Sequence, residues 1–211
     1  MKKVLWIIGA TLAVSIGLYP SLYFLFTEKF GLLLTKSPAL LANEVWWTAF
    51  YTHIVFGGIA LLVGWTQFNS QWRKKYLNTH RLVGKIYVFS VLLSGLGGGY
   101  IAFFATGGWL NSLGFGLLDI IWVYTTWRAF TDAKNKNIIS HQRMMIYSYA
   151  ACFAAVTLRL WLPILMVIFK DMEIAYGIVA WLCWVPNLFV AYRLTANIPL
   201  SKTAYSVENV Q

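Results

Sequence analysis

The sequence predicts an all-α integral membrane protein, a bundle of six transmembrane helices with both termini in the cytoplasm. The first observation is composition. Of the 211 residues, 59% are hydrophobic and 11% are charged, whereas soluble proteins have about half and about a quarter. The second observation is that the apolar residues gather in six runs, each long enough to cross a bilayer as a helix. A helix satisfies its own backbone hydrogen bonds in lipid, which makes it the expected spanning element.

The first expected span covers about residues 4–27, and Pro20 predicts a kink within it. A connection over residues 28–44 is expected to lie on the membrane surface, where Ser37 and Pro38 begin a short helical turn. Gly107 and Gly108 predict a tight turn between the third and fourth spans. The later spans are expected over residues 45–68, 86–106, 110–130, 143–169 and 174–194. Residues 1–194 thus form one transmembrane domain, and residues 195–211 form a polar, disordered cytoplasmic tail.

The basic residues predict the orientation of the bundle. The net charge is +10, and 13 of the 16 Lys and Arg residues outside the middle of the spans fall on one side of the expected membrane. Short loops rich in Lys and Arg stay in the cytoplasm, so this side is cytoplasmic. The same confinement to short loops explains the high charge without a nucleic-acid partner, and the expected partner is the lipid bilayer.

Three ionisable residues fall deep within the expected spans: His53, Asp119 and Arg159. At about 1.5 Å per residue, all three lie about 12–15 Å below the outer face. A charge at that depth needs a partner, so we expect an ion pair between Asp119 and Arg159 with His53 nearby. One interpretation is a proton or ligand site that opens outward. The other is a structural ion pair that fixes the register of the helices, and both stay open.

A second polar group surrounds His80 and His141, each of which follows a polar connection and precedes an apolar run. Asn78 or Thr79 is expected to cap the helix of His80, and Ser140 to cap the helix of His141. Both histidines then lie in the first turn of a helix that starts at the cytoplasmic face.

Arg81, Arg143 and Gln67 accompany these two histidines. Two helix N-termini with two guanidinium groups predict an anion site. Anionic lipid headgroups would account for the arginines, but they account for the histidines less well. His80 and His141 are also candidate axial ligands of one haem b near the cytoplasmic face, with the arginines at its propionates. Another metal ion is a further interpretation, although zinc would want a third or fourth ligand.

Several short motifs follow one another along the chain: His53-x-x-x-Gly57, Gly64-x-x-Gln67-Phe68, His80-Arg81-x-x-Gly84 and His141-x-Arg143-Met144-Met145. Together they resemble a family of bacterial multi-pass membrane proteins described as a domain of unknown function, over residues 45–165. The resemblance implies a multi-pass fold in the bacterial inner (plasma) membrane and no established activity. More distantly, histidines on the third and fifth spans are similar to the cytochrome b and ferric reductase superfamily. The second histidine of a two-haem arrangement is absent, so that resemblance implies one haem at most.

Three functions follow from these observations. The leading one is a redox or haem-associated membrane protein that uses His80 and His141. The first alternative is a small proton-coupled transporter or permease built on His53, Asp119 and Arg159. The second is a non-catalytic accessory subunit that contacts other membrane subunits through glycine-rich and tryptophan-rich helix faces. No nucleotide-binding loop and no catalytic triad is recognisable, so the question of enzymatic activity stays open.

Overall fold

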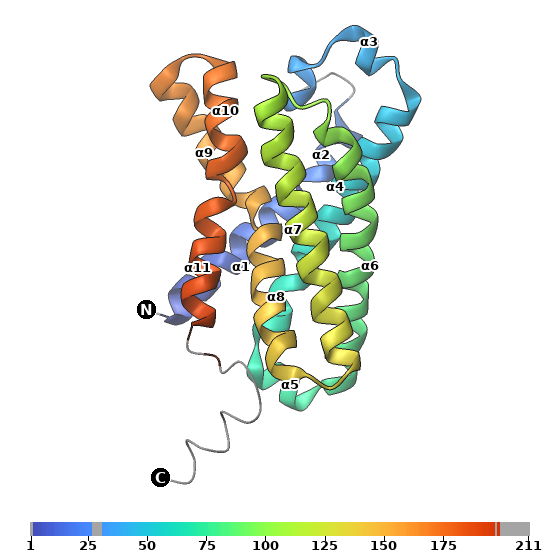
Figure 1. Cartoon of the computed structure of the whole chain (residues 1–211), viewed down its shortest axis with the longest axis vertical. Coiled ribbons are helices and arrows are strands. Elements are labelled where there is room, and N and C mark those ends of the chain that lie inside the picture. Colours follow the sequence, from blue (N-terminus) through green and yellow to red (C-terminus); the bar gives the residue numbers. More distant parts are fainter. Residues whose placement is uncertain (1, 27–30, 197, 199–211) are drawn as a thin grey trace.

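The computed structural model describes residues 2–26, 31–196 and 198, and these residues form helices and no strand (Figure 1). The long helices run along one direction, while the first helix crosses behind them. The all-α prediction is therefore confirmed for the described residues. Five segments among them are long and apolar enough to cross a membrane, namely Trp6–Leu25, Glu44–Phe68, Leu77–Ala102, Ile138–Phe169 and Met172–Thr195.

The expected fourth span is the one that does not meet this criterion. The helix in its place, α7 (Trp109–Lys134), has 26 residues, and it packs between α6 (Leu77–Ala102) and α8 (Ile138–Cys152). Its length is sufficient, but polar residues such as Asp119 and Asn111 lower its hydropathy. The structure thus supports a multi-pass bundle with five candidate spans. Most of the expected tail, from residue 199 onward, lies outside the described residues.

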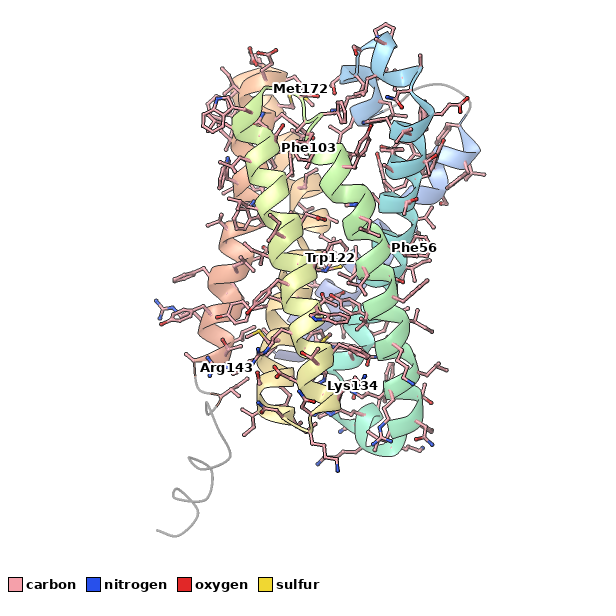
Figure 2. The ribbon with its side chains drawn as sticks, turned by 45° about the vertical axis from the view of Figure 1, so that its right-hand side comes forward. Phe56, Phe103, Trp122, Lys134, Arg143 and Met172 are labelled. Carbon is pink, nitrogen blue, oxygen red and sulfur yellow. The ribbon has the colours of Figure 1, made fainter. Side chains whose placement is uncertain are left out.

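The two ends of the bundle differ in charge. Figure 2 shows Arg143 and Lys134 towards one end and Phe103 and Met172 towards the other. The first end also holds α5 (Ser70–Lys75), which carries three consecutive basic residues in its last turn. We call it the basic end. The opposite end holds α3 (Pro38–Leu41).

The first span is broken where Pro20 predicts it. Helix α1 (Lys2–Leu18) gives way to the 3₁₀ turn η1 (Tyr19–Ser21) and then to α2 (Leu22–Leu25). The connection that follows contains η2 (Gly31–Thr35) and α3, whose cap is Ser37 as expected. The connection was expected to lie on the membrane surface, but part of it packs against the protein. Leu33 of η2 is buried against the end of the bundle opposite the basic end.

Helix α4 (Glu44–Gly64) continues into η3 (Trp65–Phe68) and packs closely against α6. A Cβ atom at Gly97 of α6 would clash with the carbonyl oxygen of Ala49, so only glycine permits this approach. Helix α6 begins at Leu77, nine residues earlier than expected. The expected caps Asn78 and Thr79 are wrong, since both lie inside the helix and its N-cap is Tyr76 without a side-chain cap.

The helix of His141 also starts differently from the prediction. Its N-cap is Asn137, whose side chain accepts from the backbone N–H of Ser140 at 3.4 Å. The expected cap Ser140 is wrong because its hydroxyl donates instead to Asp132 at 2.5 Å. The polar connection before α8 therefore shrinks to a short turn, and His141 lies in the first turn as expected.

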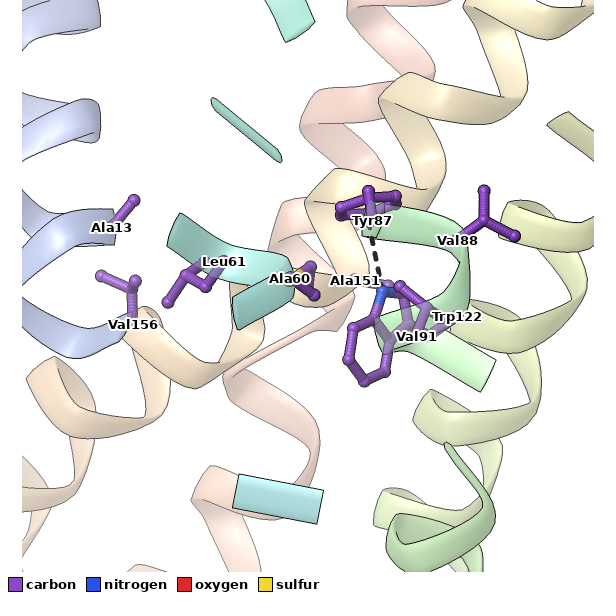
Figure 3. Packing of buried hydrophobic residues seen from close by; sticks show 10 residues of the cluster. Ala13, Ala60, Leu61, Tyr87, Val88, Val91, Trp122, Ala151 and Val156 are labelled. Atoms are coloured by element: carbon purple, nitrogen blue, oxygen red, sulfur yellow. Dashed lines mark hydrogen bonds between the residues drawn. The ribbon is translucent and has the colours of Figure 1, made fainter. Parts of the chain in front are cut away.

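A buried polar network joins α6, α7 and α8 within the hydrophobic core. The hydroxyl of Tyr87 is 2.8 Å from Ser148 Oγ, and Ser148 Oγ is 2.6 Å from Thr126 Oγ1. Nε1 of Trp122 donates to the Tyr87 hydroxyl at 3.4 Å, the contact drawn in Figure 3. All four side chains are buried, so the network fixes the relative positions of the three helices.

The last two expected spans are each broken in the middle. One consists of α8 and α9 (Ala154–Phe169), which separate at Phe153. The other consists of α10 (Met172–Leu182) and α11 (Val185–Thr195), which separate at Cys183 and Trp184. Both breaks lie at mid-height in Figure 1. Pro186 in the first turn of α11 explains the second break, because it removes a donor from the preceding turn.

Candidate ligand-binding site

A cavity of about 620 Å³ lies in the half of the bundle opposite the basic end. Its wall is built from α1, η2, α4, α6, α7, α9 and α10, with mostly apolar and aromatic side chains. The three ionisable residues expected at similar depth, His53, Asp119 and Arg159, all line it. A cavity of this size fits a drug-sized molecule, and mostly apolar walls with a few polar groups are typical of ligand sites.

His53 is held in one orientation by α6. Its Nδ1 lies 3.0 Å from the carbonyl oxygen of Ser94 and 3.2 Å from the hydroxyl of the same residue. A carbonyl oxygen only accepts, so Nδ1 carries the proton and donates. The Ser94 hydroxyl in turn donates to the carbonyl oxygen of His53 at 2.9 Å. The other ring nitrogen, Nε2, then has a lone pair and no hydrogen-bond partner among the described residues.

Asp119 lies beside His53 against a glycine face of α6. A Cβ atom at Gly98 would lie 2.6 Å from Nδ1 of His53 and 2.7 Å from Oδ1 of Asp119, so the two side chains meet over this glycine. Cβ atoms at Gly95 and Gly99 would lie 3.7 Å and 3.3 Å from the same carboxylate. Within the described part of the chain, the Asp119 carboxylate has no hydrogen bond and no ion pair. A carboxylate inside a membrane bundle without a partner is a candidate functional residue.

Arg159 makes contacts of a different kind. It donates from Nη1 to the carbonyl oxygen of Ala155 at 2.9 Å, and its guanidinium carbon lies 4.5 Å from the centre of the Tyr19 ring. The ion pair that the sequence predicted between Asp119 and Arg159 is not formed. In the described residues the ion pair within 4.0 Å is that of Arg128 with Asp132, at 3.3 Å. The guanidinium is held by its own helix and an aromatic ring, so equal depth did not bring the two charges into contact.

Two further residues of the cavity wall were not foreseen. Nζ of Lys36 donates to the carbonyl oxygen of Phe104 at 2.6 Å and to Thr106 Oγ1 at 3.1 Å, which ties the connection before α4 to the end of α6. Burial lowers the pKa of the Lys36 amine. Trp46 is only 2% exposed, and its Nε1 has no hydrogen-bond partner among the described residues. A buried donor without a partner is unfavourable unless a ligand or water supplies an acceptor.

The two helix breaks meet beside this cavity. The Asn187 amide donates to the carbonyl oxygens of Ala150 at 3.3 Å and Cys183 at 3.0 Å, and lies 3.1 Å from Thr157 Oγ1. The Thr157 hydroxyl also donates to the Cys183 carbonyl. These bonds satisfy carbonyl groups that the interrupted helices leave without an N–H partner. Sequence reasoning missed Asn187 and Thr157, and Pro186, directly before Asn187, is the sequence feature that could have indicated the break.

The second predicted cluster lies at the basic end. His80 lies in the first turn of α6 and His141 in the first turn of α8, so both lie at the basic end of the bundle. Nδ1 of His141 lies 2.9 Å from the carbonyl oxygen of Ala129 and donates to it, which leaves Nε2 available. Gln67 is buried beside Gly84 of α6.

One arginine of this cluster has a defined partner. Arg143 donates from Nη1 to the carbonyl oxygen of Ile198 at 3.0 Å. No three His, Cys, Asp or Glu side chains of the described residues come together as a metal site. Neither the cavity above nor the shallow one near α3 is lined by His80 or His141. A haem between these histidines stays a prediction from the sequence.

Comparison with known proteins supports a family and nothing finer. No curated protein and no solved structure matched the chain, so the expected similarity to the cytochrome b and ferric reductase superfamily has no support. The model of a family described as "Predicted membrane protein (DUF2306)" matches residues 50–195. That range contains His53, His80, Asp119, His141 and Arg159. The chain is thus a multi-pass membrane protein that belongs to the DUF2306 family of predicted membrane proteins.

Proposed function

We propose that the protein is a small proton-coupled permease whose binding site is the cavity lined by His53, Asp119 and Arg159. One observation carries the proposal: three ionisable residues from three different helices line one cavity inside the bundle, and none of them forms an ion pair within the described part of the chain. Ionisable groups within membrane spans are unfavourable and persist where they bind substrates or move protons. Asp119 is the candidate proton carrier, since its carboxylate has no partner among the described residues.

The two broken helices support this proposal. Membrane transporters commonly bind their substrates where spanning helices are interrupted, and the interruption lies near the middle of the membrane. Here Ala154 and Cys183, which lie at the two breaks, also line the cavity. The side chains of Asn187 and Thr157 bind each other and the Cys183 carbonyl oxygen, so the cavity borders a place where two interrupted helices are joined by side-chain hydrogen bonds.

The proposal includes the membrane topology. A helix with 26 residues is about 39 Å long, so α7 is long enough to be a sixth span despite its polar residues. Six spans put both termini on the basic side, which the positive-inside rule assigns to the cytoplasm of a bacterial inner membrane. The spanning domain then ends near Leu194, and the tail follows in the cytoplasm. A fluorescent protein fused after Gln211 should fluoresce, and an alkaline phosphatase at the same place should be inactive.

The function is tested in liposomes that contain the purified protein and a trapped pH-sensitive dye. A panel of small carboxylates, amines and neutral aromatic compounds is added outside, one class at a time. We expect one class to move protons into the liposomes with the wild type and not with Asp119→Asn, which cannot carry a proton. Glu44→Gln is the matched control, because it removes an exposed carboxylate outside the cavity, and it should keep the flux.

Two outcomes would overturn the permease proposal. One is that no class of compound moves protons through the wild type. The other is that Asp119→Asn moves protons as fast as Glu44→Gln, since the cavity carboxylate would then have no part in the flux.

A second candidate function is haem binding by His80 and His141 at the basic end. One observation favours it: the carbonyl oxygen of Ala129 orients the His141 ring and leaves Nε2 free, as is usual for histidines that ligate a metal. A bound haem would supply electron transfer. The visible spectrum of protein from haem-replete cells decides the matter. A Soret band that disappears in His80→Ala and in His141→Ala would support this function, and a spectrum without such a band would exclude it.

A further inference from the structure

We infer that the ligand of the cavity is a small monoanion with an apolar body, a carboxylate for example, and that its binding brings one proton to Asp119. This inference rests on the proposed function, because it concerns the same cavity. It goes further by naming the chemical class of the ligand and the residue that balances its charge.

The first argument concerns the anion. Arg159 lies within a spanning helix, yet no carboxylate of the described residues pairs with it. A guanidinium forms its strongest hydrogen bonds with carboxylate and phosphate groups, whereas among the described residues Arg159 donates one hydrogen bond, to Ala155. Its face rests on the Tyr19 ring, which holds the group in place without neutralising it. An anion in the cavity would supply the missing counter-charge.

A second, independent observation concerns another residue of the same cavity wall, Trp46. Nε1 of Trp46 is buried without a hydrogen-bond partner among the described residues, and Trp46 lines the cavity. The indole N–H only donates, so its missing partner is an acceptor. Lys36, at the rim of the same cavity, adds positive charge. Donors and cations on the wall favour a ligand that carries oxygen atoms with negative charge, while the apolar remainder of the wall favours an apolar body.

The proton follows from the sum of charges. With Asp119 ionised, the spanning helices contribute one carboxylate and one guanidinium to the cavity, and the Lys36 amine at the rim is bound to Phe104 and Thr106. An anion bound to the guanidinium adds a second negative charge and leaves the Asp119 carboxylate uncompensated in a region where such a charge is costly. A proton from the water phase, taken up by the Asp119 carboxylate, removes this uncompensated charge. Other titratable or charged side chains line the same cavity: Lys36, His53, Arg159, Tyr19, Tyr23, Tyr176, Cys152 and Cys183.

The anion part is tested with two probes of nearly equal shape, 1-naphthoate and its neutral amide 1-naphthamide. Binding to the detergent-solubilised full-length protein is measured by isothermal titration calorimetry, with protein-free micelles as the blank. We expect naphthoate to bind about tenfold or more tightly than the amide, since a charge-assisted hydrogen bond is lost with the amide. Arg159→Gln should remove this preference, and Arg159→Lys should restore part of it. Arg193→Gln, outside the cavity wall, is the matched control.

The proton part uses the same titration in two buffers with different ionisation enthalpies. The slope of the measured heat against the ionisation enthalpy gives the number of protons taken up per bound naphthoate. We expect about one proton for the wild type and for Glu44→Gln, and about none for Asp119→Asn, whose naphthoate binding should be retained. Naphthoate binding without proton uptake in the wild type would refute the role of Asp119.

The outcomes separate this inference from the proposed function. Equal binding of naphthoate and naphthamide would refute the anion, although a proton flux that depends on Asp119 would leave the permease standing. A preference for naphthoate that Arg159→Gln does not change would refute the assigned site. Absence of binding for both probes, together with absence of proton flux, would refute the inference and the permease alike.

Discussion

Replacement of Asn187 by leucine should destabilise the protein at the junction of the two helix breaks. Leucine has a similar volume, so the change removes hydrogen bonds without opening a large cavity. The side chain of Asn187 covers the carbonyl oxygens of Ala150 and Cys183. Thr157 continues to cover the second of them in the variant, so one carbonyl group is left without a partner.

The magnitude follows from these bonds. A side-chain hydrogen bond within a membrane contributes about 0.6 kcal/mol on average and at most about 1.7 kcal/mol. With one carbonyl orphaned and one less well covered, we expect Asn187→Leu to lower the free energy of unfolding by about 1–2 kcal/mol. Thr157→Val should cost less, because Asn187 still covers the Cys183 carbonyl. The double variant orphans both carbonyl groups and should cost about 2–4 kcal/mol, more than the sum of the single changes.

Equilibrium unfolding in mixed micelles of mild detergent and sodium dodecyl sulfate measures these differences. Asn135→Leu is the matched control, since Asn135 is exposed at the end of α7, and it should leave the stability unchanged. The reasoning would be refuted by a loss below about 0.3 kcal/mol for Asn187→Leu, or by strict additivity in the double variant.

Three other changes test the remaining contacts. Gly98→Ala inserts a methyl group between His53 and Asp119 and should weaken naphthoate binding. Gly116→Ala is the control, because its added methyl group would have no atom within 4 Å, and it should leave binding unchanged. Equal binding by both variants would contradict the proposed geometry. Tyr87→Phe removes the hydrogen bond to Ser148 and should lower the free energy of unfolding by about 1 kcal/mol, and an unchanged melting temperature would argue against a closed network. Burial lowers the pKa of Lys36 in the folded state, so the folded protein releases this proton at a lower pH than the unfolded chain does. The stability of the wild type relative to Lys36→Met should therefore rise as the pH increases towards about 10.4, the ordinary pKa of lysine. A difference in melting temperature that does not change with pH would exclude this.

Much of the fold could be predicted because the membrane restricts what each segment can be. The apolar runs predicted the helices because each run is long enough to span a membrane. The structure also contains the kink predicted from Pro20 and the turn predicted from Gly107 and Gly108. Helix starts were less predictable. Asn137 rather than Ser140 caps α8, since several polar residues in a row offer alternative caps and tertiary contacts with α7 select among them.

The candidate site was predictable in depth but not in contact. Counting residues along each helix put His53, Asp119 and Arg159 at one level, and all three do line one cavity. The rotation of each helix about its axis decides which side chains meet, and the sequence does not reveal it. Asp119 therefore lies against the glycine face of α6 beside His53, while Arg159 rests on Tyr19. Trp46 and Lys36 were missed because aromatic and basic residues near a membrane boundary usually serve as anchors.

The position of the break at Phe153 divides the charges of the cavity between two bodies. Helix α8 is fastened to α6 and α7 by the hydrogen bonds of Ser148, and α7 carries Asp119. Arg159 belongs to α9, beyond the break, where the Thr157 hydroxyl is bonded to Cys183 and Asn187 and not to α6 or α7. A tilt of α9 about Phe153 would thus carry the guanidinium away and leave the carboxylate where it is. Anion binding by Arg159 would then depend on the position of α9, whereas protonation of Asp119 would depend on α7.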